Sequence, residues 1–177
     1  MYSVLAVVLI IALIVVTLRL LREPVLRGDV LKKLRPLYLG FFPPPGLYDR
    51  IKMGSFDLSQ PGMLEFEYAP TYVGEYQIGL LVDRKIEMPK DTYDFGMSAK
   101  ITTQSRRGPH WACDVGRNPM PWWGTNSNGF TLAIFNAPED IPLRETSRFR
   151  FEVSKGSPSF AYEYGIATVY IAKRPEK

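Results

Sequence analysis

The segment 104–127 gathers most of the side chains in this chain that could do chemistry or recognise a partner. It holds all three tryptophans, the only histidine, the only cysteine and three arginines. Tryptophan and arginine are enriched in binding hot spots, because tryptophan buries a large area and arginine forms bidentate pairs with carboxylates. The residues predicted to contact a protein partner are Arg106, Arg107, His110, Trp111, Arg117, Trp122 and Trp123. In the alternative interpretation, the tryptophans fold back and plug one end of the domain.

Nucleophilic or metal chemistry in this segment is disfavoured. Catalysis by Cys113 needs a thiolate, a base within hydrogen-bond reach and an oxyanion site, and three-residue spacing from His110 in an irregular loop secures none of these. A metal site at His110, Cys113 and Asp114 lacks a further Cys or His ligand. The chain also has no glycine-rich phosphate loop and no nucleophile elbow. We therefore expect a protein that is not an enzyme and has no catalytic residue, cofactor or metal.

The elements that must hold this segment are strands. Beyond Gly46 the apolar residues alternate with polar ones, which is the period of a strand with one buried face. Strands are predicted around residues 64–68, 76–82, 95–101, 130–134, 148–153 and 160–173, with a short leading strand near 55–58. No helix of useful length is predicted after Pro36. The predicted fold class is all-β, an antiparallel two-sheet β-sandwich of about seven or eight strands behind one N-terminal transmembrane helix.

The first 18 residues carry no charge, and residues 4–16 form an unbroken apolar run. Eighteen helical residues cover roughly 27 Å, close to the ~30 Å hydrocarbon core of a bilayer. A cleaved signal peptide is the alternative, but the run lacks a charged leader and a small-x-small cleavage site. The expected domains are therefore a transmembrane helix (1–21), a basic juxtamembrane segment with a proline-rich spacer (22–46) and a β-sandwich domain (47–177).

The juxtamembrane segment combines apolar residues at helical spacing with basic residues. A short helix over 30–35 is predicted, capped by Asp29 and ended by Pro36. Such a helix is typical of a membrane surface, and a solvated stalk is the alternative. The residues predicted to contact lipid headgroups are Arg19, Arg22, Arg27, Lys32, Lys33 and Arg35. The predicted partners are therefore a lipid bilayer and a protein.

The charge balance excludes a nucleic-acid binder. The net charge of +4 lies entirely within residues 19–35, and the remaining residues carry sixteen basic and sixteen acidic side chains. A nucleic-acid-binding domain would carry its excess charge where it grips phosphate. Basic residues after the apolar run favour a cytoplasmic β-domain by the positive-inside rule.

One stretch resembles a known group of proteins. Residues 54–68 and 74–80, with the letters GSFDLSQPGMLEFEY and GEYQIGL, resemble a family of uncharacterised bacterial exported or membrane-anchored β-sandwich domains. Some members resemble immunity proteins that neutralise secreted toxins. The resemblance implies a single-pass protein of the inner (cytoplasmic) membrane with its β-domain on the periplasmic side, against the positive-inside count. It implies no functional residues.

The sequence leaves two functions open. The first is a membrane-anchored, non-enzymatic binding module for a protein, of which an immunity protein is one form. The second is an accessory or structural subunit of a larger membrane complex. Carbohydrate binding by the tryptophans is a weaker alternative.

Overall fold

The computed structural model describes residues 2–27, 32–84, 96–105, 111–115, 120–123 and 128–175. The chain divides into two compact units, one formed by residues 1–45 and the other by residues 46–176. The sequence predicted that the spacer ends at residue 46 and that the β-domain begins at residue 47.

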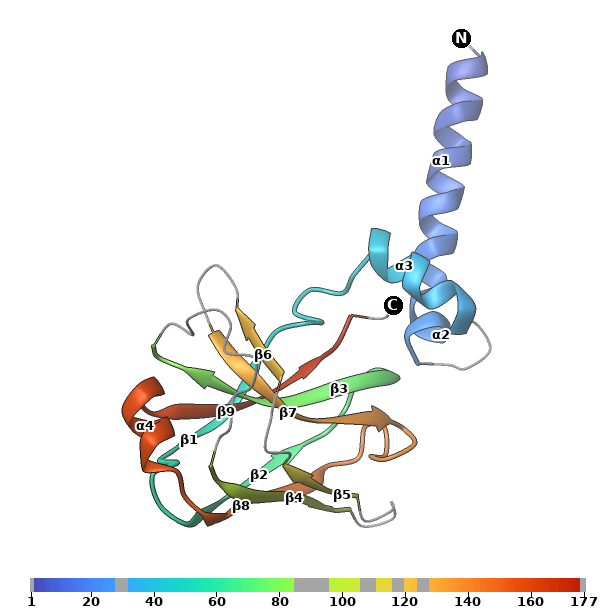
Figure 1. The fold of residues 1–177 in the computed structure, drawn as a ribbon. Coiled ribbons are helices and arrows are strands. Elements are labelled where there is room, and N and C mark those ends of the chain that lie inside the picture. Colours follow the sequence, from blue (N-terminus) through green and yellow to red (C-terminus); the bar gives the residue numbers. More distant parts are fainter. Residues whose placement is uncertain are drawn as a thin grey trace. The chain divides into compact units, whose positions relative to one another are not determined.

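The described residues of the first unit are mainly helical, and Figure 1 labels its α-helices. The helical elements are α1 (Tyr2–Leu20), α2 (Arg22–Arg27), the 3-10 helix η1 (Lys32–Leu34) and α3 (Arg35–Phe41). The prediction that Pro36 ends a helix over 30–35 is wrong, because Pro36 lies in the first turn of α3. Proline is well suited to that position, since its missing N–H would have no partner there.

The predicted transmembrane anchor is not supported. Among the residues described, no helix is both long and apolar enough to cross a membrane. This finding contradicts the single-pass localisation in the inner membrane.

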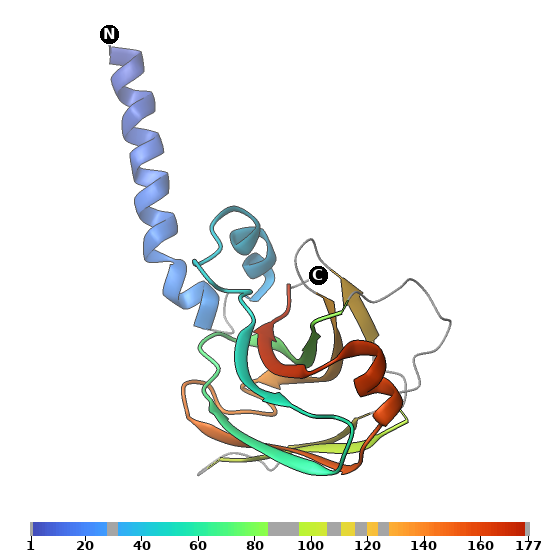
Figure 2. The ribbon, with the colours of Figure 1, turned by 90° about the vertical axis from the view of Figure 1, so that its left-hand side faces the viewer.

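The second unit is a β-sandwich, whose two sheets form separate layers in Figures 1 and 2. One sheet has the strand order β1-β9-β3-β7-β6, and the other has the order β2-β8-β4-β5. All pairings described are antiparallel. The strands are β1 (Ile51–Phe56), β2 (Gly62–Tyr68), β3 (Gly74–Val82), β4 (Ser98–Gln104), β5 (Ala112–Val115), β6 (Met120–Trp123), β7 (Asn128–Ala137), β8 (Ser147–Lys155) and β9 (Ala167–Lys173). The prediction of an antiparallel two-sheet sandwich is confirmed.

Aromatic side chains join the two layers. Phe149 of β8 stacks on Phe66 in its own sheet, with ring centroids 5.3 Å apart, and lies 5.7 Å from Phe135 of the other sheet. Phe56 and Phe151 make a second contact between the sheets at 5.5 Å. Burial of such rings removes a large apolar area from water and is the main stabilising contribution to a domain with no disulfide.

The region predicted as a final strand over 160–173 is a helix followed by a strand. The helix α4 (Pro158–Tyr164) begins at Ser157, whose hydroxyl accepts a hydrogen bond from the Phe160 N–H at 3.3 Å. Pro158 occupies the first turn, as in α3. Gly165 ends the helix with φ of 80°, a conformation that favours glycine. The sequence predicted no helix of useful length after Pro36, and the seven-residue α4 is a short exception to the strands of this unit.

Candidate functional site

The tryptophan-rich segment is not one long loop. Within 104–127 the structure has two short strands, β5 and β6, which belong to different sheets. β5 pairs with β4 in the four-stranded sheet, and β6 pairs with β7 in the five-stranded sheet. The chain therefore passes from one layer to the other inside this segment.

Most of the predicted partner-binding side chains lie outside the part of the chain that the structure describes. Arg106, Arg107, His110 and Arg117 lie outside the described residues. Trp122 and Trp123 are in β6, where they pair with Gly129 and Asn128, and their side chains are likewise outside the described part. Trp111 is the one residue of the set whose side chain is described.

Trp111 connects the two layers at the start of β5. Its N–H donates to the Thr103 hydroxyl at 3.2 Å, and its carbonyl oxygen accepts from the Thr103 N–H at 2.9 Å. Its ring meets Phe135 of the opposite sheet edge-on, with centroids 5.8 Å apart. Trp111 is therefore half-buried and packs against the core, as the plug interpretation expects of this tryptophan.

Cys113 is not poised as a nucleophile. Burial raises the pKa of its thiol, and the neighbouring Asp114 carboxylate raises it further. The neutral thiol packs partly against the core, where it acts as a small apolar group. Among the residues that the structure describes, no cluster of His, Cys, Asp and Glu could hold a metal ion.

The predicted headgroup-binding residues fall into three groups. Arg19, Arg22 and Lys33 are exposed, and the side chains of Arg27 and Lys32 lie outside the described residues. Arg35 is only 1 % exposed, and its Nε donates to the Val25 carbonyl at 2.9 Å. A buried guanidinium that fixes the backbone of α2 cannot reach a headgroup, so the prediction for Arg35 is wrong.

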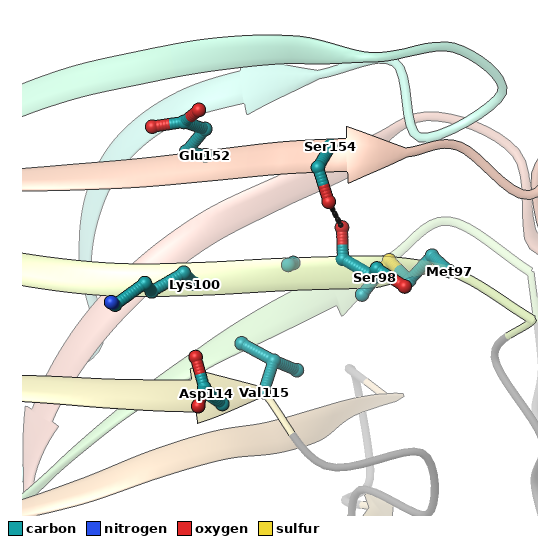
Figure 3. A pocket seen from close by; sticks show the side chains of 8 residues that line it. Met97, Ser98, Lys100, Asp114, Val115, Glu152 and Ser154 are labelled. Carbon is teal, nitrogen blue, oxygen red and sulfur yellow. Dashed lines mark hydrogen bonds between the residues drawn. The ribbon is translucent and has the colours of Figure 1, made fainter.

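The outer face of the four-stranded sheet carries charges in register across its strands. Lys100 of β4 lies opposite Asp114 of β5 on one side and Glu152 of β8 on the other. Figure 3 shows these three side chains on neighbouring strands, with the Ser154 hydroxyl donating to the Ser98 carbonyl at 3.1 Å beside them. They line a hollow of about 450 Å³.

Two arginines of β8 continue this face. Arg150 pairs with Glu152 at 3.3 Å, and Arg148 lies 3.8 Å from Glu67 of β2. Both arginines line a second hollow of about 340 Å³ together with Glu65, Gln104 and Trp111. Arg148 and Gln104 also line a third hollow, of about 840 Å³, with Arg144 and Glu145.

The three hollows follow β4 and β8. Their lining runs from Met97, just before β4, to Ser105, just after it, and from Ser154 in β8 back to Arg144, which precedes β8. The seven residues of β4 cover roughly 20 Å of this length. We call this surface the β4–β8 face. The sequence showed that Arg148, Arg150 and Glu152 alternate with buried residues, but it did not show which strands lie beside them.

No protein-family model matches this chain, and no curated protein matches it. The family resemblance of residues 54–80 therefore stays a prediction.

Proposed function

We propose that the β-sandwich is a binding module that holds a protein partner on the β4–β8 face. The observation that carries the proposal is that Trp111, Arg148 and Arg150 line one hollow of this face. These residue types dominate the energy of protein interfaces.

The character of the face supports a protein rather than a small molecule. Small-molecule sites are mostly apolar cavities with a few polar groups. The hollows here are open depressions on a sheet face rather than enclosed cavities, and charged side chains such as Glu65, Lys100 and Asp114 stand among the residues that line them. Such a surface suits a partner with complementary charges, which would set the orientation and the rate of association.

The test compares two single charge reversals at exposed strand positions. Arg150→Glu changes the β4–β8 face, and Lys52→Glu changes β1, in the other sheet. The tagged full-length chain and both variants are used to capture partners from cells of the source organism, and captured proteins are quantified by mass spectrometry. We expect a partner that is held by the wild type and by Lys52→Glu, and reduced at least about tenfold with Arg150→Glu.

The thermal midpoint of each variant is measured in parallel. An exposed arginine contributes little to stability, so the midpoint of Arg150→Glu should stay close to that of the wild type. A partner retained equally by Arg150→Glu and the wild type would place recognition elsewhere on the molecule.

A further inference from the structure

The helix α3 has a fixed orientation within the first unit. Its residues Arg35, Tyr38 and Leu39 are buried. The Tyr38 hydroxyl donates to the Leu18 carbonyl at the end of α1 at 3.1 Å, and Arg35 holds the Val25 carbonyl of α2. These two hydrogen bonds tie three helices together and determine which side of α3 faces away from α1 and α2.

The opposite side of α3 is apolar and exposed. Leu37 is 63 % exposed and Phe41 is 72 % exposed, and Leu34 just before the helix is also exposed. The spacing of three and four residues places these side chains on one helical stripe. Soluble proteins normally bury such a stripe, so an exposed one marks a surface that meets another apolar phase.

α1 adds apolar surface of a different shape. Its residues Val7 to Val16 include Leu9 and Leu13, and the large apolar side chains of this stretch are exposed around the whole helix rather than along one stripe. This exposed surface adds to the apolar stripe of α3 within the same unit.

The charges near these helices favour anionic lipid. Arg19, Arg22 and Lys33 are exposed, and the whole net charge of +4 lies within 19–35 while the rest of the chain is neutral. Basic residues close to an anionic bilayer surface are attracted to its headgroups. Apolar side chains beside basic ones are the combination by which helices bind the interface of a membrane.

We propose that the first unit binds the surface of an anionic lipid layer. Leu37 and Phe41 of α3 enter the boundary of the acyl chains, and Arg19, Arg22 and Lys33 contact the headgroups. The proposal concerns contact with lipid and requires no helix that crosses the bilayer. It is independent of the protein partner proposed for the β4–β8 face.

The test places an environment-sensitive dye at position 41 of the full chain. The variant Phe41→Cys is made in a Cys113→Ser background, so that the dye has one attachment site. The matched control is Tyr162→Cys in the same background, because Tyr162 is an exposed aromatic residue of the sandwich. Each labelled protein is mixed with vesicles of phosphatidylcholine alone and of phosphatidylcholine with phosphatidylglycerol.

We expect the emission at position 41 to shift to the blue with the anionic vesicles, and the emission at position 162 to stay unchanged. Arg19→Glu with Lys33→Glu should remove most of the difference between the two vesicle types. Equal responses at positions 41 and 162, or no response at position 41, would overturn the proposal. A blue shift at position 41 that appears without lipid and grows with protein concentration would overturn it in favour of a second copy of the chain.

Discussion

The two sheets of the sandwich differ in how far the side chains on their outer faces are exposed. In β8 of the four-stranded sheet, buried and exposed residues alternate almost perfectly, so one face packs inward and the other meets solvent. In β9 of the five-stranded sheet, nearly every residue is buried. Its Tyr170 lies fully buried over Gly79 of β3 and accepts a hydrogen bond from Gln77 at 3.0 Å.

The difference separates a surface available for recognition from one committed to packing. Gly79 has no room for a side chain, because a Cβ there would meet the Phe130 carbonyl oxygen and the Tyr170 ring. The centre of the five-stranded sheet is thus close-packed, and a substitution there should change stability. The outer face of the four-stranded sheet holds hollows and exposed charges, and a substitution there should change binding with little effect on stability.

The largest contrast is expected between two neighbouring residues of β8. Phe149→Ala should lower the free energy of unfolding by about 3–5 kcal/mol, because it removes a buried ring that contacts both sheets. Arg150→Ala should lower it by less than about 1 kcal/mol, because its side chain is half exposed. Urea titration followed by circular dichroism measures both. Similar losses for the two variants would contradict the division of β8 into an inner and an outer face.

A pH effect should come from the interior rather than from the charged face. Burial raises the pKa of Tyr76 to about 12, although its hydroxyl bonds the Tyr72 backbone, and burial also raises the pKa of Tyr68. Tyr68 packs edge-on against the Tyr76 ring, and the Lys173 Nζ lies 5.9 Å from that ring.

A folded-state pKa above the unfolded value of about 10 means that the fold favours the neutral phenol. This stabilisation is complete below pH 10, and for Tyr76 it is lost as the pH rises from 10 to about 12. The loss for Tyr76 is of the order of 2–3 kcal/mol. Urea midpoints between pH 8 and 12 would show it, and Tyr76→Phe should make the decline shallower. A decline of the same steepness in that variant would assign the effect to other groups.

A smaller effect is expected on the packed outer side of the five-stranded sheet. Tyr170→Phe keeps the ring over Gly79 and removes the hydroxyl that accepts from Gln77. The lost hydrogen bond should lower the free energy of unfolding by about 1–2 kcal/mol. Differential scanning calorimetry can detect this change, and Thr168→Ser on the same strand is a mild control. An unchanged midpoint would show that water replaces the hydroxyl.

The smallest effect is expected at the exposed pair of Glu67 and Arg148. Both side chains are about 60 % exposed, and the closest charged atoms are 3.8 Å apart. Exposed pairs contribute at most about 1 kcal/mol and are screened by salt. Glu67→Gln should therefore shift the urea midpoint only slightly at low salt and not at all in 1 M NaCl. A clear loss at high salt would mean that the pair acts through packing.

Prediction from the sequence worked best where the pattern was local. The alternation of residues 148–153 identified the inner and outer sides of β8 correctly, because side-chain direction alternates along any strand. The helix α4 was missed although Ser157 and Pro158 form a recognisable start signal, because the apolar residues that follow were interpreted as a strand. The strand predicted at 95–101 is β4, Ser98–Gln104, in which Lys100 lies exposed between two buried residues.

The site could be predicted only in part. Trp111 was singled out from its residue type, but the arginines that share its hollow come from β8, far along the chain. Arg35 was assigned to the lipid surface from its charge. In the structure it is buried, and it donates a hydrogen bond to a carbonyl ten residues earlier. Neither relation leaves a pattern in the local sequence.

The sequence alone determined the all-β class, the two-faced strands and the position of the positive charge, because these follow from the types and order of neighbouring residues. Only the tertiary structure decided that Lys100 lies between Asp114 and Glu152, and that Trp111 lines the same hollow as Arg148 and Arg150. Strand neighbours in a sandwich are set by pairing between distant segments, and many pairings satisfy the same alternation. The core packing of the whole domain selects one of them, and that selection places the candidate site.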